Sequence, residues 1–474
     1  MIDETDDGAG AGASLAVEPA LVDESAPAAG RARGLEPATG PDQEYVGASG
    51  WRAYLRALGP GLVTGASDDD PSGIATYAQA GSQFSFSMLW AALVTFPLMT
   101  AVQEICDRTA LASGKTLGEL IAVHFKRGWQ MMIGALIAVL VVANALNIAA
   151  DLVAIGQGMH LLGVGSSTLW ALIAGALITV LLAAGSFAQV ARVFKVLCVA
   201  LLAYIAVLFL IHIPWQTVVL HTITPHIQFS SAYIALLIAV LGTTISPYLF
   251  FWQAMHRVED MRAEDLGGDR AVPLRHRGHG AQQSKLHTSR FDVITGMAFS
   301  NLVMFAIITA TAATLGRTHH VTINSAAQAA AALRPVAGQF GSAVFALGFI
   351  GSGMLAVPVL AGAGSAAMAG LLGKGAGFSN SVRQAPLFYG LCAVGTVGGM
   401  ALSLLGVNPI KLLIFVAVIN GVTAAPFLIV TMLISSDRTI MGEHVNGPLA
   451  RALGWTTTVL MLLAAIALFA TGGL

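Results

Sequence analysis

The 474-residue sequence has little charge, since only 10% of its residues are Asp, Glu, Lys or Arg, against about 25% in ordinary soluble domains. Hydrophobic residues make up 56% of the chain. This balance excludes a typical soluble fold and predicts a polytopic membrane protein. The formal net charge of -1 comes from charges that are dispersed among short segments. The sequence therefore offers no basic patch for a nucleic-acid partner.

Cysteine is scarce too, and the recognised catalytic motifs are missing. The three cysteines, Cys106, Cys198 and Cys392, lie within or at the edge of apolar runs. An odd, scattered set offers neither a disulfide framework nor a metal-ligand spacing, so we expect core side chains. The chain has no nucleotide-binding loop, no His-Glu-x-x-His and no nucleophile elbow. We therefore expect neither an enzyme nor a cofactor.

Residues 1–50 differ from everything that follows. Ala, Gly and Pro dominate this stretch, and it contains ten acidic residues but only two basic ones, Arg31 and Arg33. Such a segment cannot bury enough apolar surface to become ordered. It also lacks the basic start and apolar core of a signal peptide. We expect a disordered tail.

Apolar runs of the length that crosses a bilayer as a helix, about 17 to 25 residues, recur along the rest of the chain. We expect an all-α membrane protein of about eleven transmembrane helices. Their approximate spans are 58–80, 87–107, 129–150, 168–186, 193–213, 231–254, 291–315, 338–372, 385–405, 408–434 and 452–472.

The distribution of Lys and Arg predicts the orientation of these helices. If the N-terminus is inside, 21 of the 24 basic residues fall on the inner side, and only Arg317, Arg334 and Lys411 fall outside. This agrees with the positive-inside rule. We expect a bacterial-type cytoplasmic membrane, with the N-terminus in the cytoplasm and the C-terminus outside. The connection from His256 to Arg290, rich in Arg, Gly and His, is expected to be a solvated cytoplasmic loop.

The first apolar run contains Ser67-Asp68-Asp69-Asp70-Pro71-Ser72-Gly73 near its middle. A proline removes a backbone donor and disfavours helix at the preceding residue, so the helix must break here. Ionised groups at membrane depth cost roughly 2.5 kcal/mol or more each and normally face a water-filled cavity. The alternative is a simple proline kink with acidic residues near one interface.

The sixth run is interrupted in a similar way by Gly242-Thr243-Thr244-Ile245-Ser246-Pro247-Tyr248. Paired interruptions five helices apart predict an inverted repeat of five helices plus five, with a substrate site between the two unwound segments. The expected division is a disordered cytoplasmic tail at 1–50, a first repeat at 51–213, the start of the second repeat at 214–254, a cytoplasmic loop at 255–290, the remainder of that repeat at 291–434, and the eleventh helix at 435–474.

The chain resembles the NRAMP (natural resistance-associated macrophage protein) family of divalent-metal transporters, which have the LeuT-type fold. The motifs that carry the resemblance run through most of the membrane region. They are Gly59-Pro60, Asp70-Pro71, Ala80-Gly81-Ser82-Gln83-Phe84, Gly114-Lys115, Asp151-Leu152, Ile155-Gly156, Pro247, Ser352-Gly353, Ser436-Asp437-Arg438 and Met441-Gly442.

The resemblance implies a metal site, although this chain departs from the family pattern. The family aspartate matches Asp70, but its asparagine ligand is Gly73 here, its methionine ligand is Ser246, and its carbonyl ligand belongs to Thr243. The remaining donors are oxygens, which suit Mg²⁺, Mn²⁺ and Fe²⁺. Two interpretations of the neighbouring carboxylates Asp68 and Asp69 stay open: one of them replaces the missing asparagine, or it only lines the vestibule.

The resemblance also implies weak coupling to protons. The family's relay histidine is Tyr248 here, and a tyrosine has an ordinary pKa of about 10. Of the acidic residues in the third helix only Asp151 remains, and its alternative role is an outer-end residue in contact with water. Asn301 matches a family asparagine and is expected to bond to the broken helices, and Asn420 lies near a family glutamine.

The predicted function is secondary transport of a divalent metal cation. The implied partners are the lipid bilayer and the transported ion. One alternative is a transporter of an organic solute such as an amino acid, with a carboxylate bound at the helix N-terminus near Gly73. Three adjacent aspartates argue against an anionic substrate. The other alternative is a membrane scaffold or sensor that transports nothing.

Overall fold

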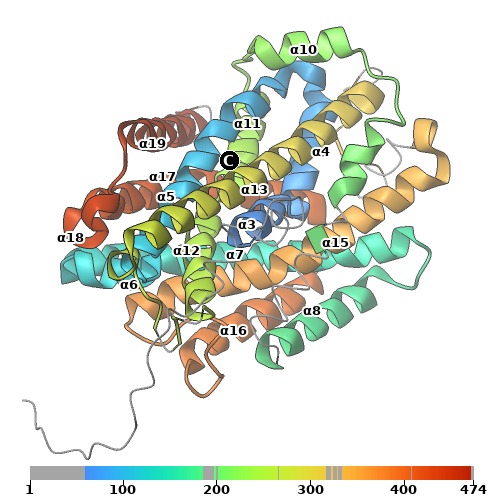
Figure 1. Cartoon of the computed structure of the whole chain (residues 1–474). Coiled ribbons are helices and arrows are strands. Elements are labelled where there is room, and N and C mark those ends of the chain that lie inside the picture. The colour runs from blue at the N-terminus through green and yellow to red at the C-terminus, as the bar shows by residue number, and fades with distance from the viewer. Residues whose placement is uncertain are drawn as a thin grey trace, which may run out of the picture. The chain divides into compact units, whose positions relative to one another are not determined.

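The chain folds into helices that break at the two places where the sequence predicts interruptions (Figure 1). The computed structural model describes residues 59–184, 197–198, 201–264, 266–268, 270–316, 322–323, 328, 334–406 and 408–470. Every regular element within these ranges is helical. The tail predicted at 1–50 and the start of the fifth span lie outside them.

The first broken helix consists of α3 (Pro60–Asp68) and α4 (Pro71–Phe84). Asp70 has an extended backbone, with φ -64° and ψ 170°, and Pro71 begins α4. This geometry follows from the steric clash between a proline ring and the residue before it. A short turn of 3-10 helix, η1 (Ser85–Met88), then leads into α5 (Trp90–Ser113).

The second broken helix consists of α11 (Ser231–Thr244) and α12 (Pro247–Arg262). Ser246 is extended, with φ -79° and ψ 134°, and Pro247 begins α12 in the same way that Pro71 begins α4. Both breaks that the sequence predicts are therefore confirmed. The same physical cause, a proline at the first position of the second segment, operates at each.

The other described helices are divided in sequence by the second broken helix (Figure 1). Before it, and after α5, come α6 (Leu117–His124), α7 (Arg127–Leu161), α8 (Ser167–Ala184) and the short α10 (Trp215–Ile223). After it come η2 (Leu274–His276), α13 (His279–Thr311), η3 (Ala312–Gly316), α15 (Arg334–Leu371), α16 (Pro386–Ser403), α17 (Pro409–Ser436), α18 (Arg438–Met441), η4 (Gly442–His444) and α19 (Pro448–Ala470).

Within the described residues, seven helices are long and apolar enough to cross a membrane alone: α7, α11 with α12, α13 with η3, α15, α16, α17 and α19. The predicted first span falls outside this set because its break leaves two short helices, α3 of 9 residues and α4 of 14 residues. The apolar stretch at Ser167–Ala183 is slightly short, and α4 with α5 is apolar enough only as a pair bent by 108°. These helices and the predicted fifth span account for the difference from eleven.

Helix α3 is positioned by close backbone contact with α13. A Cβ atom added at Gly65 would lie only 2.1 Å from the carbonyl oxygen of Gly296. The Asp292 carboxylate of α13 accepts hydrogen bonds from the backbone N–H groups of Gly59 and Gly61, each at 2.8 Å, and of Leu62 at 3.1 Å. A carboxylate at a helix N-terminus satisfies free donors and interacts favourably with the helix dipole. The N-terminus of α3 is therefore fixed by one side chain.

A buried ion-pair network continues from Asp292 to two further helices. The Arg257 guanidinium of α12 lies 2.7 Å from Asp107 of α5, 3.2 Å from Asp292 and 3.0 Å from Asp260. Arg257, Asp107 and Asp292 are all buried. Opposite charges that pair and hydrogen-bond in this way can be accommodated away from water. The network joins α3, α5, α12 and α13 at the end of the bundle where α3 begins.

This network corrects the expectation of a solvated loop from His256 to Arg290. Helix α12 continues to Arg262 and α13 begins at His279, so the connection is limited to 263–278. His256 and Arg257 lie buried in α12. Their polar sequence indicates solvent exposure, but the partners of Arg257 on α5 and α13 allow its burial. The three cysteines are buried, as expected of core side chains.

Candidate functional site

The three consecutive aspartates at the α3–α4 break are completely buried, with 0% of each side chain exposed. Asp70 is the N-cap of α4. Its Oδ1 accepts hydrogen bonds from the Gly73 backbone N–H at 2.7 Å and from the Ser72 hydroxyl at 2.6 Å. These bonds satisfy donors at the start of the helix. Asp70 is therefore held in one orientation by the helix that it begins.

The second oxygen of Asp70 points toward α7. It accepts a hydrogen bond from Nδ2 of Asn147 at 2.7 Å. Asn147 is fully buried, and its Oδ1 has no hydrogen-bond partner in the described part of the chain. An unpaired buried amide oxygen costs about 1–3 kcal/mol. Such an atom beside a carboxylate is suited to join it in binding a cation.

Asp68 and Asp69 have fewer hydrogen bonds than Asp70. Oδ2 of Asp68 accepts a hydrogen bond from the Ser300 hydroxyl of α13 at 2.6 Å. Among the described residues, Oδ1 of Asp68 and both carboxylate oxygens of Asp69 have no hydrogen-bond partner. A buried, unpaired carboxylate is costly, so these atoms require a proton, water or a cation.

The α11–α12 break lies directly beside the first one. The Tyr248 hydroxyl donates to the carbonyl oxygen of Ser67 at 3.1 Å. A Cβ atom at Gly73 would lie 3.1 Å from Oγ1 of Thr243 and 3.1 Å from the carbonyl oxygen of Asp68. Because Gly73 has no side chain, the two unwound segments approach closely. Their free backbone groups therefore face a shared region.

Two predicted ligands on the second break have different surroundings. The Ser246 hydroxyl donates to the carbonyl oxygens of Gly242 at 2.5 Å and of Thr243 at 3.0 Å. The Ser246 hydroxyl thus bonds to carbonyl groups at the C-terminal end of α11. The Thr243 carbonyl, a predicted metal ligand, already accepts one of these hydrogen bonds. Oγ1 of Thr243 is buried and has no partner within the described ranges. This hydroxyl is an additional oxygen donor at the break.

Three other predicted residues are placed as follows. Asp151 lies fully buried in α7, with Oδ2 3.5 Å from Nδ2 of Asn147. It is not the water-exposed outer-end residue of the alternative interpretation. Asn301 accepts a bond from the Thr95 hydroxyl of α5 at 3.2 Å, rather than bonding to a broken helix. Asn420 is buried in α17, and its Oδ1 lacks a partner among the described residues.

Sequence reasoning missed Asn147 and Ser300. Asn147 stands four residues before Asp151 and therefore shares its helix face, which is a readable signal. Ser300 precedes Asn301, and the contact with a broken helix expected of the asparagine belongs to the serine. In the part of the chain that the structure describes, no three His, Cys, Asp or Glu side chains converge as a metal site. A cation at the break would therefore need amide, hydroxyl or carbonyl oxygens beside at most two carboxylates.

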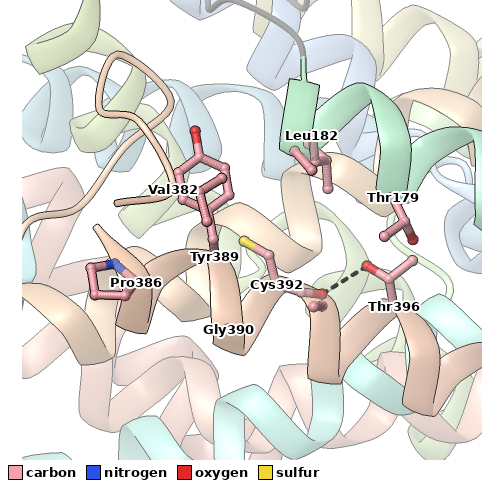
Figure 2. A pocket seen from close by; sticks show the side chains of 10 residues that line it. Thr179, Leu182, Val382, Pro386, Tyr389, Gly390, Cys392 and Thr396 are labelled. Atoms are coloured by element: carbon pink, nitrogen blue, oxygen red, sulfur yellow. Dashed lines mark hydrogen bonds between the residues drawn. The ribbon is translucent and has the colours of Figure 1, made fainter. Parts of the chain in front are cut away.

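A separate cavity of about 320 Å³ lies between α8 and α16 (Figure 2). Its lining is mainly apolar, and its polar side chains include Thr179, Tyr389, Cys392 and Thr396. Figure 2 shows the Thr396 hydroxyl bonded to the backbone oxygen of Cys392, at 2.8 Å. None of the lining residues is a carboxylate. This cavity therefore lacks the donors that a hard cation requires.

Comparison with known proteins extends over nearly the whole chain. The family model described as natural resistance-associated macrophage protein-like matches residues 61–471. The divalent metal cation transporter MntH of Caldanaerobacter subterraneus subsp. tengcongensis is 24% identical, over 89% of this chain and 94% of that protein. MntH of Aeromonas hydrophila subsp. hydrophila is 26% identical, over 86% and 94%.

Solved structures show the same fold. The crystal structure of the Eremococcus coleocola manganese transporter in complex with an aromatic bis-isothiourea substituted compound matches with a TM-score of 0.69 and 17% identity, over 90% of this chain and 88% of that one. Mhp1, a nucleobase-cation-symport-1 family transporter in a closed conformation, matches with a TM-score of 0.52 and 12% identity, over 88% and 93%. The fold is therefore that of the LeuT-type transporters.

Proposed function

The chain belongs to the natural resistance-associated macrophage protein-like (Nramp) family, and from this premise we propose that it moves divalent metal cations across a membrane as a secondary transporter. The relatives named as divalent metal cation transporters match nearly their whole length. The chain is an integral membrane transporter rather than an enzyme, and the metal is its substrate.

The observation that carries the proposal is the juxtaposition of the two helix breaks around a buried carboxylate. Asp70 faces Asn147, and the Tyr248 hydroxyl bonds to the Ser67 carbonyl across the junction. We propose that the ion binds Asp70 together with the amide oxygen of Asn147 and with oxygens of Thr243. Asn147 would supply the neutral oxygen that Gly73 lacks. All these donors are hard, which suits Mg²⁺ and Mn²⁺.

In this proposal, Asp68 and Asp69 line the vestibule of the ion site and do not bind the ion directly. The hydrogen bond that Asp68 accepts from Ser300 of α13 supports that role for Asp68 over direct replacement of the missing asparagine. Buried negative charge also disfavours an organic solute that presents a carboxylate at the start of α4. The five-plus-five halves at 51–213 and 214–434 would then close around a cation.

The orientation of the transporter is part of the same proposal. The Lys and Arg distribution places the N-terminus in the cytoplasm and the C-terminus outside a cytoplasmic membrane. The buried network of Arg257 and Asp292 then lies at the inner end of the bundle. The binding site would lie between that network and the outer end of α4.

Uptake of Mn²⁺ and Mg²⁺ by the purified protein in liposomes tests the proposal. Asp70→Asn should abolish uptake, because it removes the charge of the carboxylate that accepts a hydrogen bond from Asn147 of α7. Glu443→Gln is the matched control, since Glu443 is exposed in η4 and should retain normal uptake. Unchanged uptake in Asp70→Asn, with protein that folds and inserts normally, would remove Asp70 from the site.

A further inference from the structure

Two histidine rings stack on each other at one end of the helices, well separated in sequence from both helix breaks. His221 lies in α10, and His226 lies in the connection from α10 to α11. Their ring centroids are 4.8 Å apart, and their planes are inclined by 25°. His221 is half-buried, and His226 is exposed. The pair therefore lies at the surface of the protein.

The same ring nitrogen is occupied in both residues. Nδ1 of His221 lies 2.9 Å from the carbonyl oxygen of Thr217, and Nδ1 of His226 lies 3.1 Å from that of Thr224. A carbonyl oxygen can only accept a hydrogen bond, so Nδ1 carries the proton in each ring. The Nε2 lone pair of each neutral ring is then left for another ligand. Histidines that bind metals usually have this arrangement, with the second nitrogen bonded to a carbonyl or carboxylate.

The spacing of the rings suits one shared ion. Two nitrogens bound to the same Zn²⁺ at about 2.0–2.1 Å lie about 3–4 Å apart. Ring centroids 4.8 Å apart bring the two side chains within reach of one ion, and binding would turn the rings from their stacked arrangement so that both Nε2 atoms face it. The chain has no charged residue between Lys195 and Arg257, so no neighbouring lysine or arginine in sequence repels a cation here. Water would complete the coordination.

The histidine pair adjoins the end of the first broken helix. The His221 ring lies 6.3 Å from that of Phe86 in η1, the turn that follows α4. The Tyr233 hydroxyl lies 2.8 Å from the carbonyl oxygen of His226 and 3.3 Å from that of Ser87, also in η1. Helix α10 packs against η1 and α5. An ion that joins the two rings would therefore stiffen the contact between the α10–α11 connection and the end of α4.

We propose that His221 and His226 form a second, surface metal site that takes a divalent cation with a preference for imidazole nitrogen, such as Zn²⁺, and that the bound ion slows transport by restraining η1. The nitrogen donors distinguish this site from the oxygen-rich break, because imidazole suits Zn²⁺ better than Mg²⁺ or Mn²⁺. Binding at the pair is independent of the proposed function, whereas its effect on transport rests on it. The charge distribution predicts that the pair is on the outer side.

Zn²⁺ titration of the full-length detergent-solubilised protein by calorimetry tests the binding. Excess Mn²⁺ is present to occupy the oxygen-rich site. We expect one Zn²⁺ site that weakens at least tenfold in His226→Gln and in His221→Gln. His160→Gln is the matched control, because Nδ1 of His160 also lies 3.1 Å from a carbonyl, that of Gly165, and the ring is exposed. No ring contact within the described residues involves His160.

Zn²⁺ inhibition of Mn²⁺ uptake, with Zn²⁺ added outside proteoliposomes, tests the effect on transport. The Zn²⁺ concentration that inhibits uptake by half should rise at least tenfold in His226→Gln. It should stay unchanged in His160→Gln. Unchanged Zn²⁺ binding in both pair variants, or equal loss in the control, would overturn the site. Loss of binding with unchanged inhibition would overturn the restraint on η1. Absence of Mn²⁺ uptake in every variant would instead count against the proposed function and leave the binding result intact.

Discussion

Asp70 combines two duties in one side chain. It begins α4 through its bonds to Ser72 and Gly73, and it faces Asn147 through its other oxygen. The family resemblance identifies Asp70 from sequence, because the Asp-Pro pair is retained. Asn147 could be found only by placing it on the same helix face as Asp151. Its partnership with Asp70 spans 77 residues and depends on how α7 packs, which a local pattern does not specify.

Asn147→Ala should raise the KM for Mn²⁺ at least tenfold, because the variant removes the amide beside Asp70. Asn144→Ala is the matched control. Asn144 also lies buried in α7, and its Nδ2 donates to the Leu360 carbonyl at 2.9 Å. Asn144→Ala loses its hydrogen bond to Leu360, and Asn147→Ala loses its short bond to Asp70 and its longer one to Asp151, so each should cost about 1–3 kcal/mol in stability. Only Asn147→Ala should change KM. If Asn147→Ala and Asn144→Ala changed KM equally, Asn147 would have only a structural role.

Ser246→Met should shift preference toward Cd²⁺, because a thioether is a soft donor and a hydroxyl is not. The wild type should show little preference for Cd²⁺ over Mn²⁺, and excess Mg²⁺ should compete with Mn²⁺. Competition of each ion against Mn²⁺ uptake provides the measurement. A wild type that strongly prefers Cd²⁺, or whose Mn²⁺ uptake is unaffected by excess Mg²⁺, would require a soft ligand from elsewhere. Met354 in α15 would be the first candidate.

At the scale of elements, the sequence predicts broken helices well and connections poorly. Pro71 and Pro247 act on their immediate neighbours, so their effect on the chain is local and readable. The burial of Arg257 depends instead on Asp107, 150 residues away. A run of charged residues at the end of α12 therefore indicates a solvated loop when its partners are unknown. The C-terminal end of α12 can be placed correctly only when the packing of its charged residues against other helices is known.

Asp292→Asn should destabilise the protein by about 3–5 kcal/mol, because it leaves Arg257 buried with one partner fewer and weakens the acceptor at the start of α3. Asp260→Asn is the control on the same guanidinium. The Asp260 side chain is 39% exposed, so its pair should contribute only about 0–1 kcal/mol. Thermal unfolding in detergent measures both. Equal losses in the two variants would mean that burial does not determine the strength of this network.

At the scale of the whole molecule, the fold and the family support one mechanism class. Two helix breaks, five helices apart in the predicted count, lie side by side and present oxygen donors to a common region. We expect the same arrangement to limit proton coupling, because Tyr248 donates its hydroxyl to the Ser67 carbonyl and, by the family resemblance, stands in place of a histidine. Under the proposed function, the molecule would bind the metal between the two breaks and lack one part of the proton path.

Mn²⁺ uptake into liposomes should proceed with little acidification of the interior, because a tyrosine hydroxyl does not exchange a proton near neutral pH as a histidine does. A pH-sensitive dye inside the liposomes, read together with Mn²⁺ entry, provides the measurement. Protein-free liposomes and the Asp70→Asn variant set the background. Metal-dependent acidification well above this background would show that another group relays the proton. Asp151 in α7 would be the first candidate.

Anomalous diffraction from crystals soaked in Mn²⁺ tests the central claim most directly, because it locates the ion without relying on transport. We predict a peak between the α3–α4 and α11–α12 breaks, within about 2–2.6 Å of an Asp70 carboxylate oxygen, and its loss in crystals of Asp70→Asn. A peak that persists in Asp70→Asn, or that occurs only away from the two breaks, would contradict the account.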